Sequence, residues 1–266
     1  MALAIAVVVA LITVISVAIV VLKVWWMPLD ISTHGPAIDH QMNLTLIFTG
    51  IIFILAQLGL AWFVWKYRDR GDGRKAIYSH GHGMLEATWT AMAAVLFIGL
   101  NLMGYRMWAE MYFRGAPPDA LRVQVLGQQF AWYFRYPGPD GQFGPTHVEK
   151  VNDASGNFYG IDRERDPGSK DDIVTATLAV PVNRPVELVL LAKDVTHDFY
   201  VRELRIQQDM VPGMQIPVHF TATKTGRFEI ACNQLCGLGH YKMRAFLEVM
   251  SEEDFQKWLQ NMAAQQ

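Results

Sequence analysis

Three long apolar runs near the N-terminus constrain the fold of this chain more than any other feature of its sequence. The first run, Met1 to Leu22, contains no charged side chain, and as a helix it would be roughly 33 Å long, enough to cross the hydrocarbon core of a membrane. The second run is Leu44 to Trp65, and the third is Met84 to about Tyr105. We therefore expect three transmembrane helices followed by a domain outside the bilayer.

The N-terminal position of the first run also allows its interpretation as a secretory signal. A signal core, however, spans only about 7–15 apolar residues and follows Lys or Arg residues. The run Met1–Leu22 is longer and has no Lys or Arg before it. We interpret it as a retained transmembrane helix.

The basic residues of the chain predict how it crosses the membrane. The segment 66–80 is rich in Lys and Arg, whereas the segment 27–43 between the first two runs contains neither. Under the positive-inside rule, the segment 66–80 is cytoplasmic and everything after Tyr105 is outside. Aromatic residues gather at the ends of the runs, as they do at membrane interfaces: Trp25, Trp26, Trp62, Trp65, Tyr105 and Trp108. We expect an integral protein of a bacterial cytoplasmic membrane, in contact with lipid, with its outer domain in the periplasm.

From Leu121 onward the pattern changes to short β-type segments separated by turn residues. Several of these segments alternate apolar and polar residues, which favours a half-exposed sheet and hence a β-sandwich or Greek-key barrel. The segment 137–172, rich in Gly, Pro, Asp and Asn, is predicted to be a long polar excursion between strands. The predicted strands are Arg122–Leu126, Gln129–Tyr136, Ile173–Val180, Val186–Ala192, Gln215–Thr223, Arg227–Ala231 and Ala245–Met250.

These patterns predict the domain organisation of the whole chain. We expect an N-terminal transmembrane helix over 1–26, then a transmembrane helical hairpin over 27–110 that contains the cytoplasmic loop 66–80. An outer β domain follows over 111–250. A helix over 251–266 ends the chain, with Ser251 and the acidic residues behind it at its N-terminus. The formal charge of −2 gives no argument for binding of nucleic acid.

The segment Cys232–Met243 concentrates soft metal ligands. It holds both cysteines of the chain, with His240 four residues after Cys236 and Met243 three residues after that histidine. Thiolate, imidazole and thioether favour copper over hard cations. Zinc accepts cysteine and histidine, but its sites rarely include methionine. A single blue-copper ion needs only one cysteine, so two close thiolates are better explained by a pair of copper ions bridged by both sulfurs.

Simpler interpretations of the same residues stay open at this point. Two cysteines in an exported domain often form a disulfide, and Met243 could simply fill the core. A disulfide would leave the spacing of His240 and Met243 without an explanation. The sequence ranks copper first, a disulfide second and zinc third. A copper pair needs a further ligand, for which we favour His197, just after an apolar strand, over His219 within a predicted strand.

The chain resembles subunit II of haem–copper cytochrome c oxidases over nearly everything after residue 40. The spacing Cys232-x-Gln234-x-Cys236-x-x-x-His240-x-x-Met243 is similar to the binuclear copper-A motif of that family. The segment Asp194–His197 resembles the one that supplies the second histidine ligand. The segment 203–213 (Glu-Leu-Arg-Ile-Gln-Gln-Asp-Met-Val-Pro-Gly) resembles the loop that follows it.

Two further segments carry the resemblance. The segment Gln129–Trp132 resembles the aromatic segment through which the family accepts electrons. The segment Glu86–Thr90 resembles the start of the last span, whose glutamate is associated with a proton-uptake path. The resemblance therefore implies that Glu86 takes part in proton uptake and that Trp132, or its neighbour Tyr133, receives the electron.

The resemblance implies a cupredoxin-like domain that holds two copper ions. In this family pattern Cys232 and Cys236 bridge the ions, and His197 and His240 each bind one of them. Met243 and the backbone carbonyl of Gln234 are the weak ligands. The centre would accept electrons from cytochrome c and pass them to haem in subunit I, where oxygen is reduced to water with proton pumping. Contacts with subunits I and III, and haems and a further copper in subunit I, are implied as well.

The chain departs from the family pattern at three places. Gln234 stands where the family usually has a glutamate that also helps to bind magnesium, so the magnesium site is doubtful. Phe130 stands where the family has an exposed tryptophan, so electrons must reach the centre by another route. The run Met1–Leu22 is an additional helix, which could contact further subunits. We hypothesise that the donor is a cytochrome c held in a larger respiratory assembly. A nitric oxide reductase subunit and a membrane-anchored copper chaperone are the alternatives.

Overall fold

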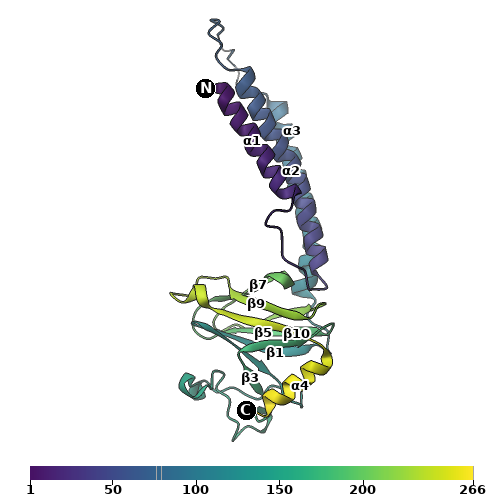
Figure 1. Cartoon of the computed structure of the whole chain (residues 1–266), viewed down its shortest axis with the longest axis vertical. Helices are drawn as coiled ribbons and strands as arrows, with labels where there is room; N and C mark the ends of the chain where they lie inside the picture. Colours follow the sequence, from purple (N-terminus) through teal and green to yellow (C-terminus); the bar gives the residue numbers. More distant parts are fainter. Residues whose placement is uncertain (76, 79, 266) are drawn as a thin grey trace. The chain divides into compact units, whose positions relative to one another are not determined.

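The structure is a computed structural model that describes residues 1–75, 77, 78 and 80–265 (Figure 1). It has two compact units. One contains Met1–Met27 and Ala37–Met107, and the other contains Pro28–Pro36 and Trp108–Gln266. The first unit is helical, and the second is a β domain with a short segment of the N-terminal region added to it.

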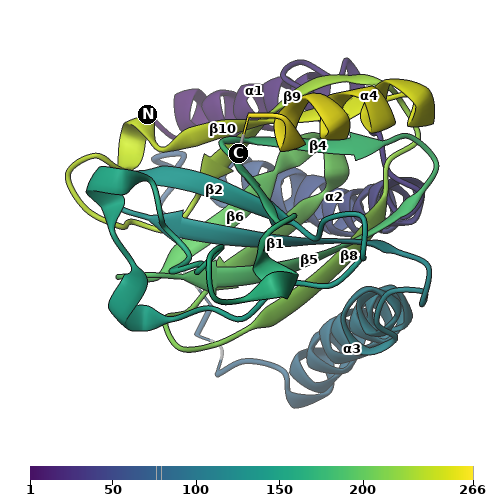
Figure 2. The same ribbon diagram turned by 90° about the horizontal axis from the view of Figure 1, so that it is seen from below.

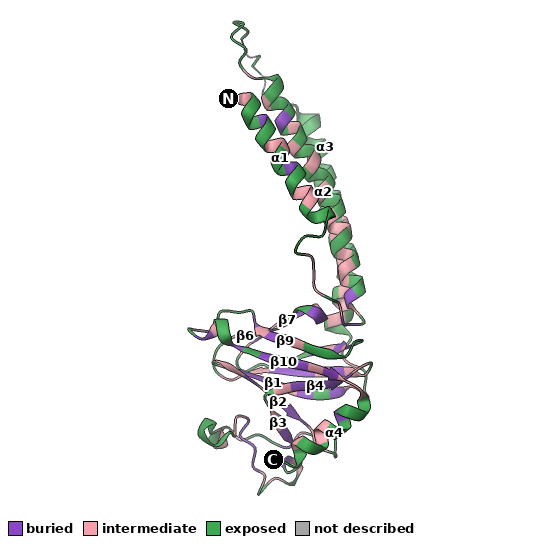
Figure 3. Cartoon of the chain, viewed as in Figure 1, coloured by how far each residue is buried: buried purple, intermediate pink, exposed green. Residues whose placement is uncertain are grey.

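The helical unit consists of α1 (Ala2–Val21), α2 (Gly35–Lys66) and α3 (Gly83–Phe113). All three helices are long and apolar enough to cross a membrane, which confirms the predicted transmembrane helices. Their side chains are largely exposed in the single chain (Figure 3), as expected of surfaces that lipid or other proteins cover. The second helix starts earlier than its apolar run, because Pro36 favours a first helical turn and the Ser32 hydroxyl accepts a hydrogen bond from the Gly35 N–H at 2.9 Å.

The C-terminus of α1 forms a Schellman motif. The Lys23 N–H donates to the Val20 carbonyl at 3.1 Å, and the Val24 N–H donates to the Ile19 carbonyl at 3.0 Å. Lys23 has φ of 53°, the left-handed conformation that this motif requires and that glycine adopts most easily. A side chain at such a position costs about 1–2 kcal/mol, so the lysine is not the residue that backbone geometry alone would favour.

The β domain is a sandwich of two sheets that share one core of buried residues, and buried residues occur along the strands of both sheets (Figure 3). One sheet has the strand order β3-β2-β1-β5-β8, and the other has the order β4-β10-β9-β6-β7. The strands are β1 (Leu121–Gln128), β2 (Ala131–Tyr136), β3 (Ile173–Thr175), β4 (Thr177–Pro181), β5 (Pro185–Ala192), β6 (His197–Val201), β7 (Ile206–Met210), β8 (Ile216–Thr221), β9 (Gly226–Cys232) and β10 (Arg244–Met250). The predicted fold class, apolar helices followed by a β-sandwich, is confirmed.

Two strand predictions differ from the structure. The predicted strand Ile173–Val180 is in fact two strands, because the chain leaves one sheet after β3 and enters the other with β4. The hairpin of β6 and β7 was not predicted. Its polar residues obscure the alternation, since Asp198 is buried although it is charged, and the middle of β7 is polar.

The segment Pro28–Pro36 is fixed to the edge of the sandwich. Ile31 is fully buried in the core, and its N–H donates to the Glu203 carbonyl at 3.1 Å. Its carbonyl accepts from the Thr223 N–H at 2.7 Å, and Ser32 forms a β-bridge with Ala222. This segment therefore belongs structurally to the β domain although it precedes α2.

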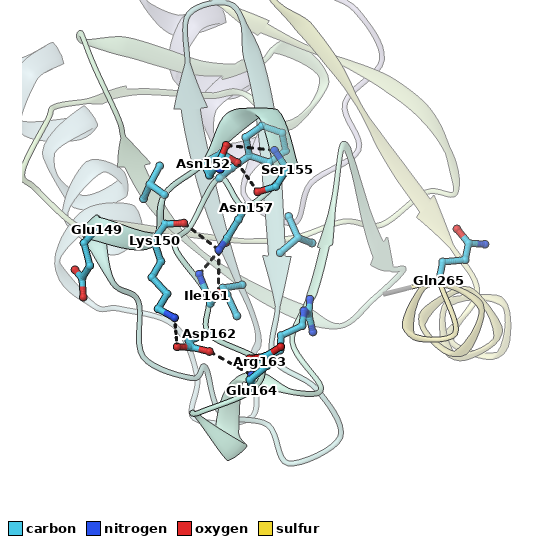
Figure 4. A pocket seen from close by; sticks show the side chains of 14 residues that line it. Glu149, Lys150, Asn152, Ser155, Asn157, Ile161, Asp162, Arg163, Glu164 and Gln265 are labelled. Carbon is cyan, nitrogen blue, oxygen red and sulfur yellow. Dashed lines mark hydrogen bonds and ion pairs between the residues drawn. The ribbon is translucent and has the colours of Figure 1, made fainter.

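The excursion 137–172 is an ordered loop anchored by a buried ion pair. The Arg135 guanidinium on β2 pairs with the Asp172 carboxylate and donates to the Gly144 carbonyl at 2.6 Å, and both charged side chains are fully buried. Figure 4 shows the outer part of the loop, where Asn157 Nδ2 donates to the Lys150 and Ile161 carbonyls around a hollow of about 720 Å³. The loop is thus a folded part of the domain.

The helix α4 (Glu252–Ala263) covers one edge of the sandwich beside β3 and β4 (Figure 2). Ser251 is its N-cap, as predicted, and its hydroxyl accepts from the Asp254 N–H at 3.1 Å. Trp258 packs edge-on against Tyr136 of β2, with ring centroids 5.3 Å apart. This contact fixes the helix to the sheet that carries Arg135.

Candidate metal centre

One end of the sandwich brings His197 and the segment Cys232–Met243 together. His197 is the first residue of β6, and Cys232 is the last residue of β9. The two strands pair antiparallel with Phe199 opposite Cys232, so the histidine and the cysteine lie side by side at the same end. His197 was predicted to follow the strand that ends near Ala192; in the structure it begins a strand of its own.

The side chains predicted as metal ligands converge on the two cysteine sulfurs. The Cys232 Sγ and Cys236 Sγ atoms are 3.8 Å apart. His197 Nδ1 lies 3.9 Å from the Cys232 sulfur, and His240 Nδ1 lies 3.6 Å from the Cys236 sulfur. Each sulfur thus has one imidazole nitrogen directed at it.

The two weak donors approach the same sulfurs. Met243 Sδ lies 3.7 Å from the Cys236 sulfur, and the Gln234 carbonyl oxygen lies 3.2 Å from the Cys232 sulfur. The distance of 3.8 Å between the sulfurs is far longer than the ~2.05 Å of a disulfide, and both thiols are free. The donor set, with two thiols, two imidazoles and a thioether, fits a pair of copper ions.

Most of the site is buried. Cys232, Cys236 and Met243 are buried and His197 is fully buried, whereas His240 is half-buried and Gln234 is exposed. The atoms of His197, Cys232 and Cys236 that could bind a metal all lie within 4.8 Å of one another. Burial keeps these soft ligands in fixed positions and excludes competing water.

Residues outside the ligand set orient His197. Asp194 Oδ1 accepts from His197 Nε2 at 2.8 Å, which leaves Nδ1 to face the sulfurs. The other oxygen of Asp194 accepts from the Gln129 N–H at 2.8 Å. Gly127 of β1 faces the ring so closely that a Cβ atom there would lie 3.1 Å from His197 Cδ2. The lack of a side chain at Gly127 therefore makes room for the imidazole.

The surroundings of the two cysteines shift the pKa values of their thiols in opposite directions. Burial opposes ionisation of Cys232, but hydrogen bonds with His197 and the backbone lower the pKa of this thiol below its usual value. Burial and the neighbouring Cys232 sulfur raise the pKa of Cys236. The pKa of His197 is raised overall. Burial alone would lower this pKa, but the hydrogen bonds with Cys232 and Asp194 outweigh the effect of burial. These contacts thus favour ionisation of the Cys232 thiol, and the thiolate is the form of cysteine that binds metal.

The aromatic residues predicted to receive electrons lie at different depths. Trp132 is only 2% exposed, and its ring centroid lies 6.2 Å from that of His197. Tyr133 is half-buried and stacks on Phe158 of the excursion with centroids 3.5 Å apart. Phe130 is half-buried and lies against the segment Cys232–Met243, hereafter the ligand loop. A Cβ atom on Gly239 of this loop would come within 2.4 Å of the Phe130 ring. Phe130 is thus the aromatic side chain in contact with the loop, and Trp132 is an inner one.

Two other candidate residues are not part of this group of side chains. His219 is on β8 of the other sheet, opposite Glu187. Glu86 belongs to the helical unit, in the first turn of α3. Its carboxylate accepts from the His82 N–H at 3.3 Å, and His82 Nδ1 accepts from the Leu85 N–H at 3.2 Å. This reciprocal pair caps the helix.

Three contributors to the site were not predicted as such. Gln129 donates through Nε2 to the Cys236 carbonyl at 2.5 Å, and Gly127 and Asp194 hold His197 as described. Asp194 and Gln129 were noticed only as parts of motifs. The signal that could have identified them is their position at strand ends beside the ligand histidine, and this position depends on strand pairing far along the chain.

Comparison with known proteins identifies the family of this chain. The family described as cytochrome c oxidase subunit II, periplasmic domain, matches residues 121–250. The "alternative cytochrome c oxidase subunit 2" of Bradyrhizobium diazoefficiens is 37% identical over 243 residues, covering 89% of this chain and 83% of that protein. Cytochrome c oxidase subunit 2 of Cereibacter sphaeroides is 27% identical over 223 residues, covering 81% and 72%.

Among solved structures, the periplasmic domain of cytochrome oxidase subunit II of Bradyrhizobium japonicum is similar, with 24% identity and a TM-score of 0.42, covering 56% of this chain and 97% of that one. Fold and sequence together define a membrane protein with a cupredoxin-like outer domain. The chain belongs to the cytochrome c oxidase subunit II family.

Proposed function

We propose that this chain is the electron-transfer subunit of a cytochrome c oxidase and that its ligand loop holds a binuclear copper centre. The observation that carries the proposal is the convergence of two imidazole nitrogens, a thioether sulfur and a backbone oxygen on two free cysteine sulfurs. A disulfide would not need these neighbours, and a single zinc ion would not need the methionine.

Each residue has a definite role in this proposal. Cys232 and Cys236 would both hold the copper pair through their sulfurs, and His197 and His240 would each supply an imidazole nitrogen. Met243 and the Gln234 carbonyl oxygen are weaker ligands at the two ends. When bound, the copper pair supplies a store for one electron shared between two ions. The rigid sandwich and the hydrogen bond from His197 to Asp194 keep the ligands in place, so little rearrangement is needed when the charge changes.

The electron route follows from the position of the domain outside the membrane. The donor is a cytochrome c, either soluble or part of a larger respiratory assembly, and the acceptor is a haem in subunit I of a bacterial cytoplasmic membrane. Phe130, in contact with the ligand loop, forms part of the docking surface, and Trp132 acts as an inner relay. Subunit III and the haems and copper of subunit I complete the assembly, in which oxygen is reduced with proton pumping.

The residue at position 234 does not favour magnesium binding in this chain. The side chain of Gln234 is exposed and carries a neutral amide, while magnesium prefers carboxylates. The proposed copper role of position 234 uses only its backbone oxygen and is unaffected. We therefore propose the copper pair without a magnesium ligand at Gln234.

A pair of methionine variants tests this function. Met243→Leu keeps the buried volume but removes the thioether, whereas Met214→Leu changes an exposed methionine outside the site. We expect Met243→Leu to alter the copper absorption spectrum and to slow oxygen consumption with reduced cytochrome c, and Met214→Leu to change neither. Equal behaviour of the two variants would contradict the proposal. Consumption of nitric oxide instead of oxygen by the purified assembly would assign it to a nitric oxide reductase.

A further inference from the structure

The helical unit contains an apolar groove between α1 and α2. Its volume is about 690 Å³. Aliphatic side chains form most of its walls, and Asn43, Lys23 and Trp26 lie at one end. Its aliphatic walls include Val17, Val20, Leu46, Ile47 and Ile51, with Gly50 between them on α2. The two helices run in opposite directions (Figure 1), so Ser16 of α1 and Ile54 of α2 lie at the other end of the groove.

The groove is the length of one membrane leaflet. Along α2 it extends from Asn43 to Ile54, which corresponds to roughly 17 Å of helix, about half of the hydrocarbon thickness of a bilayer. A transmembrane helix of another subunit would follow the entire span. A lipid in a single leaflet has the matching length.

A single cation stands at the end of the groove. Lys23 is the only Lys or Arg among residues 1–65, and its Nζ atom lies 5.8 Å from the centroid of the Trp26 ring. The lysine occupies the left-handed position of the Schellman motif, where glycine would fit with less steric cost. Lysine and tryptophan side chains next to each other at a membrane interface suit the headgroup region of a lipid.

We propose that this groove binds one anionic phospholipid of the outer leaflet. The phosphate lies at Lys23 and Trp26, the polar backbone of the lipid lies beside Asn43, and an acyl chain follows the aliphatic walls towards Ser16 and Ile54. The positive charge makes the site selective for anionic over zwitterionic headgroups. This site adds a lipid contact that is independent of the metal centre.

Two matched pairs of variants test the site in the purified full-length chain. Lys23→Gln removes the cation. Its control is Lys66→Gln, which removes a lysine that also lies over a tryptophan, with Nζ 4.2 Å from the centroid of the Trp62 ring, but does not line this groove. Gly50→Leu fills the groove, since nothing lies within 4 Å of a Cβ atom there, and its control Gly59→Leu has equally open space on α2 but does not line the groove.

The measurement is retention of phosphatidylglycerol and phosphatidylcholine by native mass spectrometry. We expect the chain to retain more phosphatidylglycerol, and Lys23→Gln to lower this retention about fivefold, the order of effect of one lysine beside an anionic surface. Gly50→Leu should lower retention of both lipids, and neither control should change it. Equal retention of the two lipids, or no effect of Lys23→Gln, would overturn the proposal. So would an intact assembly that carries no lipid in this groove because another subunit fills it.

Discussion

At the scale of single residues, the orientation of His197 decides whether this site can hold metal. The Asp194 carboxylate accepts from Nε2, and Gly127 leaves room for the ring, so Nδ1 faces the Cys232 sulfur. Loss of such an outer partner typically weakens metal binding because the imidazole is no longer held in its tautomer and direction. Asp194 is thus as much a part of the site as a ligand.

The variant Asp194→Asn tests this dependence. It keeps one oxygen acceptor but replaces the oxygen that accepts from the Gln129 N–H or from His197 with a donor. We expect copper affinity to fall by about 10–100-fold, measured by competition with a chelator. Asp140→Asn, at an exposed turn where the carboxylate accepts from the Gln142 N–H, is the control and should leave the affinity unchanged.

Glu86 has two possible roles, which can be separated by substitution. Its carboxylate caps α3 through the His82 N–H. Glu86→Gln retains an oxygen that can accept this hydrogen bond but cannot carry a proton. If Glu86 takes part in proton uptake, this variant slows oxygen turnover of the assembly and leaves copper absorbance intact, whereas Glu110→Gln at the other end of α3 changes neither turnover nor copper absorbance. Normal turnover in Glu86→Gln would leave only the capping role.

Most of the proposed ligands could be identified from the sequence because they lie in one local segment. Cysteines, histidine and methionine within the segment Cys232–Met243 need only one loop to meet. His197 could be proposed but not placed, since its position depends on the pairing of β6 with β9. Gly127 and Gln129 could not be assigned roles, because a glycine and an amide have no chemistry of their own until a neighbour far along the chain is known.

At the scale of structural elements, a buried ion pair joins the excursion 137–172 to the sandwich. Arg135 lies on β2 and Asp172 just before β3, and both are fully buried. Composition predicted a polar loop between strands, but it did not predict that a buried ion pair anchors this loop to the sandwich. Removing one member of a buried pair leaves an uncompensated charge, which is far more costly than the loss of a surface pair.

Two arginine variants on neighbouring strands compare these situations. Arg135→Met should lower the free energy of unfolding by about 3–5 kcal/mol. Arg122→Met removes an exposed pair with Glu187 and should cost at most about 1 kcal/mol. Chemical denaturation followed by tryptophan fluorescence measures both. Equal losses would contradict the anchoring role of Arg135.

The effect of Arg135→Met should depend on pH. Burial raises the pKa of Asp172, and Arg135 opposes this rise. Without the arginine the folded-state pKa rises further above the unfolded value, so stability falls as pH increases and is regained on acidification. We expect the loss in Arg135→Met to be smaller at about pH 5 than at about pH 8. A loss that is the same at both pH values would show that Asp172 is not the charge left unpaired.

The strand pattern shows which elements the sequence can and cannot predict. The apolar strand β5 and the alternating strand β10 were predicted to within one residue at each end. The hairpin of β6 and β7 was missed because Asp198 is buried and the middle of β7 is polar. His197 is part of this hairpin. Near the proposed site, the side chains do not follow the alternation that an ordinary half-exposed sheet would show.

At the scale of the whole molecule, the chain combines membrane helices with an outer domain whose site is mostly buried. The three membrane-spanning helices could be predicted because their length and their lack of charge identify them. The attachment of Pro28–Pro36 to the β domain could not, since only the burial of Ile31 and its backbone hydrogen bonds reveal it.

The central claim is that both cysteines share two copper ions. Electron paramagnetic resonance of the oxidised, purified assembly, together with its copper content, tests this claim most directly. We predict hyperfine splitting from two equivalent copper nuclei, and loss of this signal in Cys236→Ser. A signal from one copper nucleus, a bound zinc ion, or a disulfide between Cys232 and Cys236 in the isolated protein would contradict it.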